Sequence, residues 1–167
     1  MGKFHDLIDR ADSYQAALRG FFLDVESWRK FSASVPLQWQ RVKFWPGAKE
    51  NIPEQRGIYV FSIEVEGLGL PPHGYILYVG ITGNTSAANL RKRHSQYVRN
   101  LINENGRPKV FAMLKRWRDD LIFYFVPIPE SAIDLTQIEK SFINSVRPPV
   151  NEADFDADIA DAKKATF

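Results

Sequence analysis

Two neighbouring runs of the sequence have the pattern of β-strands: GIYVFSIEV at residues 57–65 and YILYVGIT at residues 75–82. In the first run, large apolar side chains alternate with Ser62 and Glu64, which is the period of a strand that buries one face. The second run is apolar at both odd and even positions, which is typical of a strand covered on both faces. Pro71 and Pro72 interrupt the segment between the runs. We therefore predict a β-hairpin with a long tip.

The segments after the hairpin predict three helices and one further strand. From Leu90 to Ile102, apolar residues recur every three or four positions, the spacing of an amphipathic helix, and a shorter helix is predicted over Val110–Arg118. Leu121–Ile128 has the composition of a strand. The last helix is predicted to begin after Asp134, a residue type that caps helices, and to end before Pro148.

The first fifty residues are predicted to form a helical extension. Residues 4–34 have apolar residues at helical spacing and are expected to form one helix that ends before Pro36. Proline and glycine between residues 45 and 53 indicate a loop, so we divide the chain into an N-terminal helical extension, residues 1–50, and a domain over residues 51–167. The expected fold class is α/β, a compact domain with a small three-stranded sheet flanked by helices.

Several large apolar side chains lie near the end of this extension, and three roles are open for them. They can pack on the core, which we favour, form a dimer surface, or stack on nucleic-acid bases. These residues are Trp28, Phe31, Leu37, Trp39, Phe44 and Trp45.

The composition is that of a folded intracellular protein. Its 167 residues correspond to about one domain, and the 44% hydrophobic and 25% charged residues exclude a disordered or fibrous protein. The chain has no cysteine, which excludes disulfide scaffolds, cysteine-bound zinc, iron–sulfur clusters and thiol nucleophiles. The N-terminal residues lack the apolar run of a secretory signal, and no segment approaches the roughly 18 apolar residues of a membrane span. We expect a soluble, cytoplasmic protein with no membrane partner.

Positive charge is concentrated in one segment of the chain. The formal net charge is only +2, but residues 89–118 hold nine basic residues and one acidic residue, a surplus of +8. Such a surplus can attract a polyanion such as DNA, although basic side chains also cover ordinary solvated helices. Candidates for nucleic-acid binding are Arg91, Lys92, Arg99, Lys109, Lys115 and Arg116.

Two tripeptides of the hairpin resemble a known signature. Gly57-Ile58-Tyr59 and Tyr78-Val79-Gly80 are similar to the paired motifs of the GIY-YIG nuclease family. Further matches follow in the family's order on the expected element types: Arg93, Tyr97, Glu139 and Asn151. The resemblance extends from Ile52 to Asn151. It implies a compact GIY-YIG-like domain and a metal-dependent endonuclease that hydrolyses DNA phosphodiester bonds with Mg²⁺, or with Mn²⁺ as a substitute.

The resemblance also implies a role for each matched side chain. Glu139 would bind the metal, a role that suits a single carboxylate because protein-bound Mg²⁺ usually keeps several waters. Arg93 and Tyr97, four residues apart on one helix face, would hold the phosphate. One of Tyr59 and Tyr78 would activate water; we expect Tyr59, and the opposite assignment is open.

Asn151 would fix local geometry by hydrogen bonds, although asparagine is also an ordinary turn residue after prolines. Two departures from the family's pattern are visible. Ile81 stands where many members have a basic or small polar residue, so a phosphate contact there is missing or supplied elsewhere. The loop over residues 82–89 is longer than in compact members, which leaves the choice between Arg93 and Arg91 open.

Three functions have to be distinguished. A nuclease is favoured by the matched positions beside the basic segment. A non-cutting nucleic-acid-binding module on the same scaffold would share that segment, and a protein-interaction domain would use the basic residues only for solubility. A nuclease of this size has one active site per chain, so a double-strand cut would require a homodimer or two successive nicks.

Overall fold

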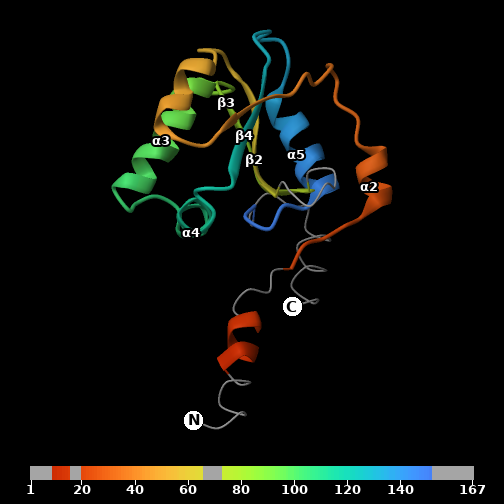
Figure 1. Cartoon of the computed structure of the whole chain (residues 1–167). Coiled ribbons are helices and arrows are strands. Elements are labelled where there is room, and N and C mark those ends of the chain that lie inside the picture. The colour runs from red at the N-terminus through yellow and green to blue at the C-terminus, as the bar shows by residue number, and fades with distance from the viewer. Residues whose placement is uncertain (1–8, 16–19, 66–72, 152–167) are drawn as a thin grey trace.

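A four-stranded antiparallel sheet forms the centre of the molecule (Figure 1). The computed structural model describes residues 9–15, 20–65 and 73–151. The strand order is β1-β4-β2-β3, with β1 at Gln40–Lys43, β2 at Gly57–Val65, β3 at His73–Thr82 and β4 at Leu121–Pro127. The predicted α/β class is confirmed, whereas the predicted three-stranded sheet is wrong because β1 pairs with β4. The sheet therefore contains residues from both sides of the boundary that was expected near residue 50.

The predicted β2–β3 hairpin is present, but the expectation that its first strand buries only one face is wrong, because α5 covers the second face and Ser62 is buried. Its two strands pair antiparallel, with Tyr59 opposite Gly80 and Val60 opposite Val79. The apolar residues of β2 point alternately to the two faces of the sheet, and both faces are covered along most of the strand. The predicted tip of the hairpin, residues 66–72, lies outside the described residues.

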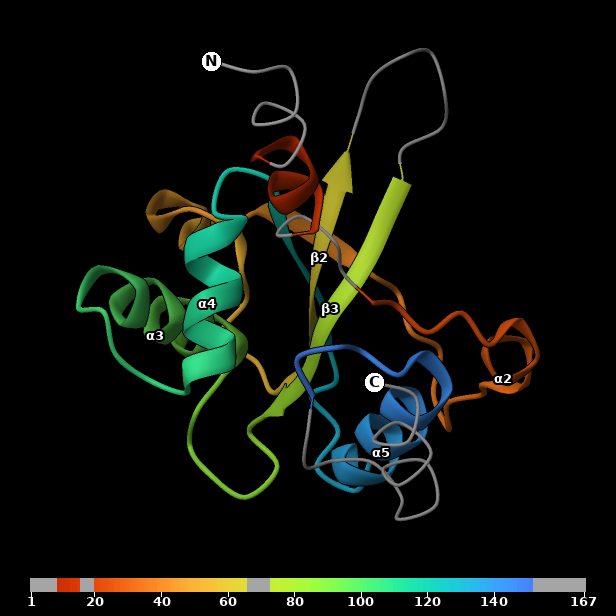
Figure 2. The same ribbon diagram turned by 90° about the horizontal axis from the view of Figure 1, so that it is seen from below.

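Helices cover both faces of the sheet. On one face lie α3, Leu90–Ile102, and α4, Pro108–Arg116; on the other lie α5, Leu135–Val146, and α2, Val25–Lys30 (Figures 1 and 2). The alternation of β2 separates the two cores, because Tyr59 packs with the α3 and α4 side chains whereas Ile58 packs with those of α5. The three helices predicted after the hairpin are thereby confirmed.

The single helix predicted over residues 4–34 is wrong within the described residues. Residues 9–15 and 25–30 are helical, but residues 20–24 are not. Asp24 starts the second helix by accepting a hydrogen bond from the Ser27 amide at 3.0 Å. An N-cap residue has non-helical backbone angles, so a continuous helix cannot pass through it. The loop predicted over residues 45–53 contains a short 3₁₀ helix, η1, at Pro46–Asn51.

The cap predicted for α5 is present. The Asp134 carboxylate accepts a hydrogen bond from the Thr136 amide at 2.9 Å, and the helix ends at Arg147, whose φ is +51°, directly before Pro148. Within the described ranges every helix is too short or too polar to span a bilayer.

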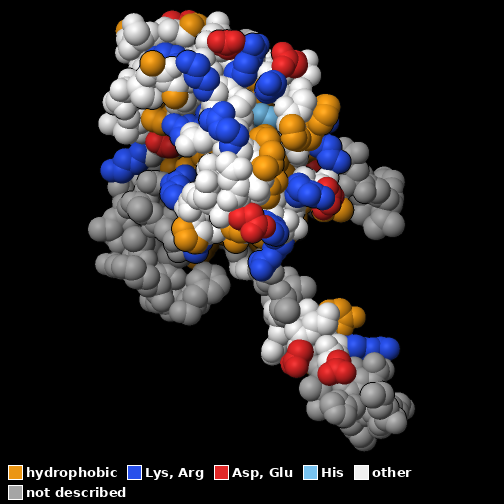
Figure 3. Space-filling view, turned by 90° about the vertical axis from the view of Figure 1, so that its left-hand side faces the viewer, with side chains coloured by type: hydrophobic (Ala, Val, Ile, Leu, Met, Phe, Trp, Pro, Cys, Tyr) orange, Lys and Arg blue, Asp and Glu red, His pale blue; other side chains and the backbone are white. Residues whose placement is uncertain are grey.

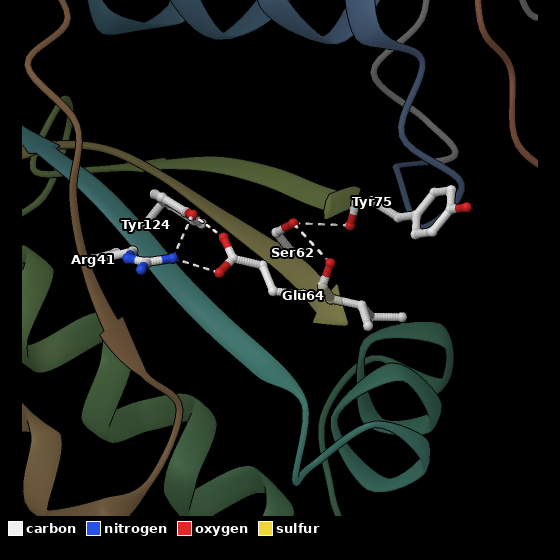
Figure 4. A network of polar contacts seen from close by, with 6 residues as sticks. Arg41, Ser62, Glu64, Tyr75 and Tyr124 are labelled. Atoms are coloured by element: carbon white, nitrogen blue, oxygen red, sulfur yellow. Dashed lines mark hydrogen bonds and ion pairs between the residues drawn. The ribbon is translucent and has the colours of Figure 1, made fainter. Parts of the chain in front are cut away.

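A polar network fastens β1 to the rest of the sheet (Figure 4). Glu64 on β2 accepts hydrogen bonds from the Arg41 guanidinium on β1 and from the Tyr124 hydroxyl on β4. The Glu64 side chain is only 9% exposed, so this interaction is better shielded from water than an ordinary surface ion pair. Charged contacts therefore complement the limited apolar contact of a strand whose burial is only partial.

Candidate active site

Three tyrosines from three elements meet where α3 packs on the sheet. Tyr59 on β2, Tyr78 on β3 and Tyr97 on α3 are all buried, and the centroids of their rings lie 6.0–6.4 Å apart. The Tyr59 and Tyr97 hydroxyl oxygens are 2.9 Å apart and form a hydrogen bond. The structure thus brings together three of the six residues predicted to be catalytic.

A glycine on β3 makes room for this cluster. A Cβ atom added to Gly80 would lie 2.5 Å from the Tyr59 hydroxyl oxygen and 2.6 Å from the ring carbon that carries it. Since Gly80 is paired with Tyr59 across the hairpin, the phenol ring can lie over the neighbouring strand only where that strand has no side chain. The lack of space for a side chain beside Tyr59 therefore explains why glycine stands at this position of the second tripeptide.

Arg107, the residue directly before α4, also contacts the cluster. Its guanidinium donates a hydrogen bond to the Tyr78 hydroxyl at 2.6 Å and lies 5.1 Å from the centroid of the Tyr78 ring. Burial alone would lower the pKa of Arg107, but the hydrogen bond with Tyr78 and the nearby phenols raise it. The sequence analysis counted Arg107 in the basic segment without assigning it to the site, and no local pattern indicates that this arginine reaches β3.

Arg93 lies close enough to act electrostatically on Tyr59. One terminal nitrogen of its guanidinium donates to the Gln96 side chain at 2.9 Å. Its Nε atom is buried and has no hydrogen-bond partner among the described residues. A buried charged donor without an acceptor is costly, so the Arg93 guanidinium retains unused hydrogen-bonding capacity.

Burial determines the resting protonation of two of the phenols. Burial, and then the nearby Tyr97 and Tyr78, raises the pKa of Tyr59 well above its ordinary value, and the positive charge of Arg93 opposes this effect. Burial also raises the pKa of Tyr97. Both hydroxyls therefore keep their protons at neutral pH.

Asn151 fastens the chain to the middle of β3. Its side-chain oxygen accepts from the Val79 amide and its side-chain nitrogen donates to the Val79 carbonyl, both at 2.9 Å. The side chain thus forms the two hydrogen bonds that a neighbouring strand would form. Val79 lies between Tyr78 and Gly80, so this contact holds the strand at the tyrosine cluster.

Glu139 is half-buried on α5, which packs on the face of the sheet opposite to the tyrosines. The described residues contain no group of three or more His, Asp or Glu side chains that could hold a metal ion. A single carboxylate is still compatible with Mg²⁺, which is commonly held by one or two carboxylates, waters and substrate phosphates. The structure does not place Glu139 in the tyrosine cluster, and a cation held by this one carboxylate would be bound mainly through water and phosphate.

Arg56, which the sequence analysis did not select, sets the position of α5. Its guanidinium donates to the Asn84 side chain and to the Ile133 carbonyl, each at 2.9 Å, and to the Gly83 carbonyl at 3.3 Å. Asn84 in turn donates to the Thr136 hydroxyl at 2.8 Å. These contacts join the loop after β3 to the first turn of α5.

The six residues predicted to bind nucleic acid differ in their contacts. Arg91 is used within the fold, because it donates to the Ile52 carbonyl at 2.8 Å and pairs with Glu54 at 2.7 Å. Lys115 pairs with Glu104, and Arg116 lies 5.6 Å from the centroid of the Trp117 ring. The other three side chains, Lys92, Arg99 and Lys109, are exposed, as Lys115 and Arg116 also are. Basic side chains gather on the α3 and α4 side of the molecule (Figure 3).

No family model, curated protein or solved structure matches the chain. The clustered side chains nevertheless have a definite chemistry. Arg93 acts electrostatically on Tyr59, and Arg107 acts on all three phenols. Two guanidinium groups beside three hydroxyls form a set of donors suited to phosphate oxygens.

Proposed function

We propose that this chain is a metal-dependent endonuclease that hydrolyses DNA phosphodiester bonds at the tyrosine cluster. The observation that carries the proposal is the convergence of Tyr59, Tyr78 and Tyr97 with Arg93 and Arg107. Phosphodiester hydrolysis requires charge compensation at the phosphate and a positioned water. The guanidinium groups can supply the first and the hydroxyls the second.

The contacts of each side chain indicate its role in phosphate binding, orientation or activation of water. The Arg93 guanidinium, whose buried Nε has no partner among the described residues, would turn so that it donates to a non-bridging phosphate oxygen. Tyr59 is buried and hydrogen-bonded to Tyr97, so we assign these two hydroxyls to orientation. Tyr78, whose hydroxyl oxygen accepts from Arg107, is then the group that positions and activates water. This assignment exchanges the roles expected from the sequence for Tyr59 and Tyr78.

Glu139 is the carboxylate that we propose as the Mg²⁺ ligand. When bound, the cation would neutralise charge on the scissile phosphate. The chain's own contribution is the placement of this carboxylate, because Arg56 and Asn84 fix the first turn of α5 relative to the end of β3.

The proposal is tested by incubating the protein with supercoiled plasmid in Mg²⁺, Mn²⁺ or EDTA and separating the products by gel electrophoresis. We expect nicked or linear DNA with either metal and none in EDTA. Glu139→Ala should abolish cleavage, and Tyr78→Phe should slow it by about 10²–10⁴-fold if the hydroxyl acts in proton transfer. Tyr75→Phe is the matched control, because Tyr75 lies on the same strand and is exposed. Cleavage retained by Glu139→Ala would contradict the role of this carboxylate.

A second candidate is a nucleic-acid-binding module that does not cut. One observation favours it: α5, which carries Glu139, packs on the face of the sheet opposite to the three tyrosines. Salt-sensitive DNA binding without cleavage of plasmid, single-stranded or branched DNA in any divalent metal would favour this module. Absence of DNA binding even at low salt would favour a protein-interaction domain instead.

A further inference from the structure

A hollow of about 530 Å³ lies beside Trp45, between the end of β1, the C-terminal half of α3 and the segment after α4. Apolar and basic side chains both line it, among them Lys43, Trp45, Val98, Ile102, Lys115 and Arg118. The space-filling view of this side of the molecule shows apolar side chains between the basic ones (Figure 3).

Trp45 is exposed but held in place. Its side chain is 57% exposed, whereas Phe44 is buried in the core and Trp39 packs on Phe142 with ring centroids 5.8 Å apart. A Cβ atom added to Gly47 would lie 2.2 Å from a carbon of the Trp45 ring. The indole therefore rests directly on the backbone of η1. Packing on the core explains Phe44 and Trp39 but not Trp45.

A second hollow is lined by other residues of the same two elements, α3 and η1, and the two hollows together have a surplus of positive charge. Together they are lined by seven basic and four acidic side chains, a difference of three. Each acidic side chain has a basic partner: Glu104 pairs with Lys115, Asp119 with Arg118, Glu50 with Lys49 and Glu54 with Arg91.

The surplus belongs to three residues. Lys43, Lys92 and Arg99 line the two hollows and form no ion pair within the described ranges. Lys43 on β1 lines the same hollow as the indole, and Lys92 and Arg99, near the two ends of α3, line the second hollow. The pattern of an anchored aromatic ring next to free cations is that of a surface that follows a charged backbone and stacks on its bases.

We propose that these two hollows bind an unpaired stretch of a DNA strand, with one base stacked on Trp45 and phosphates near Lys43, Lys92 and Arg99. Bases in a duplex present only their edges, so an indole face can stack only on a base that is unpaired. The inference rests on the proposed nuclease function and deepens it, because it names DNA with a single-stranded region as the substrate.

The test is fluorescence anisotropy of a labelled oligo(dT) and of a labelled blunt-ended duplex, each titrated with the full chain in EDTA so that no cleavage occurs. Trp45→Ala should weaken oligo(dT) binding by about 5- to 150-fold and affect the duplex much less. Trp45→Phe, which retains a ring, should keep most of the affinity. Trp28→Ala is the matched control, because Trp28 is a partly exposed tryptophan on α2, on the other face of the sheet.

A second measurement separates stacking from charge. The triple variant Lys43→Gln, Lys92→Gln, Arg99→Gln should reduce the dependence of log K on log salt by about 2 for a single strand. Circular dichroism confirms that each variant is folded. Unchanged oligo(dT) affinity in Trp45→Ala, or an unchanged salt slope in the triple variant, would overturn the inference while leaving plasmid cleavage as a separate test of the nuclease.

Discussion

We predict that the protein loses stability between pH 6.5 and pH 4 because of His94. The His94 side chain on α3 is completely buried, its ring lies 5.3 Å from those of Phe44 and Phe123, and neither ring nitrogen has a hydrogen-bond partner among the described residues. Burial lowers the pKa of His94 from 6.5 to about 4.

The direction and size of the effect follow from proton linkage. In the unfolded chain the imidazole takes up a proton near pH 6.5, whereas in the folded chain it does so only near pH 4. The unfolded state therefore binds more protons within this interval, so stability is complete above pH 6.5 and falls as the pH decreases. Each tenfold change in proton affinity corresponds to about 1.4 kcal/mol, and the whole change to about 3 kcal/mol.

Urea unfolding at several pH values between 7 and 4 measures this loss. Titrating carboxylates add their own pH dependence, so the variant His94→Leu serves as the reference at each pH. We expect the free energy of unfolding of the wild type to fall by about 3 kcal/mol more than that of the variant across the interval. Parallel curves for the two proteins, or an NMR titration that gives His94 a pKa near 6.5, would refute the reasoning.

Three further changes test other contacts. Gly80→Ala should lower the free energy of unfolding by about 1–3 kcal/mol and abolish cleavage, because the added carbon collides with Tyr59; Gly74→Ala on the same strand, whose added carbon meets its nearest atom at 3.5 Å, is the control, and equal losses would contradict the steric argument. Asn151→Ala should lower stability by about 2 kcal/mol and accelerate hydrogen exchange at the β3 amide that it now occupies, and unchanged exchange would argue against this contact. Asp134→Ala should cost about 1 kcal/mol in a thermal melt followed by circular dichroism, since it removes the cap of α5, and an unchanged melting temperature would speak against the cap.

Local patterns were sufficient for the hairpin and for the helices that follow it. The alternation in residues 57–65 has the period of a strand, and Asp134 is a residue type that caps the N-terminus of a helix. Each of these signals lies within one element. They could therefore be interpreted without knowledge of what the element contacts.

The first fifty residues could not be interpreted in this way. The strand β1, Gln40–Lys43, places only Val42 against the core, so it has no apolar alternation to detect. Its partner β4 lies far away in the sequence. Conversely, helical spacing over residues 4–34 concealed the interruption before Asp24, because apolar periodicity alone does not show that a polar side chain caps a new helix.

In the candidate site, too, some residues could be selected from the sequence and others could not. The resemblance selected Tyr59, Tyr78 and Tyr97 by their positions in the sequence, and the structure brings them together. The two arginines that organise the surroundings, Arg56 and Arg107, were not selected. Their long side chains act on partners from other elements, and such contacts depend on tertiary packing rather than on any local pattern.

The position of Asn151 also bears on how the protein avoids associating with itself. An outer strand with free amide and carbonyl groups is a template for pairing with another chain, and β3 is such a strand. The Asn151 side chain occupies the outward groups of Val79, and the Val150 amide occupies the Leu77 carbonyl at 3.0 Å. Both residues follow every strand that the structure describes, so during synthesis the middle of β3 stays open until they emerge. A chain that ends before them would present this open edge permanently and would be prone to aggregation.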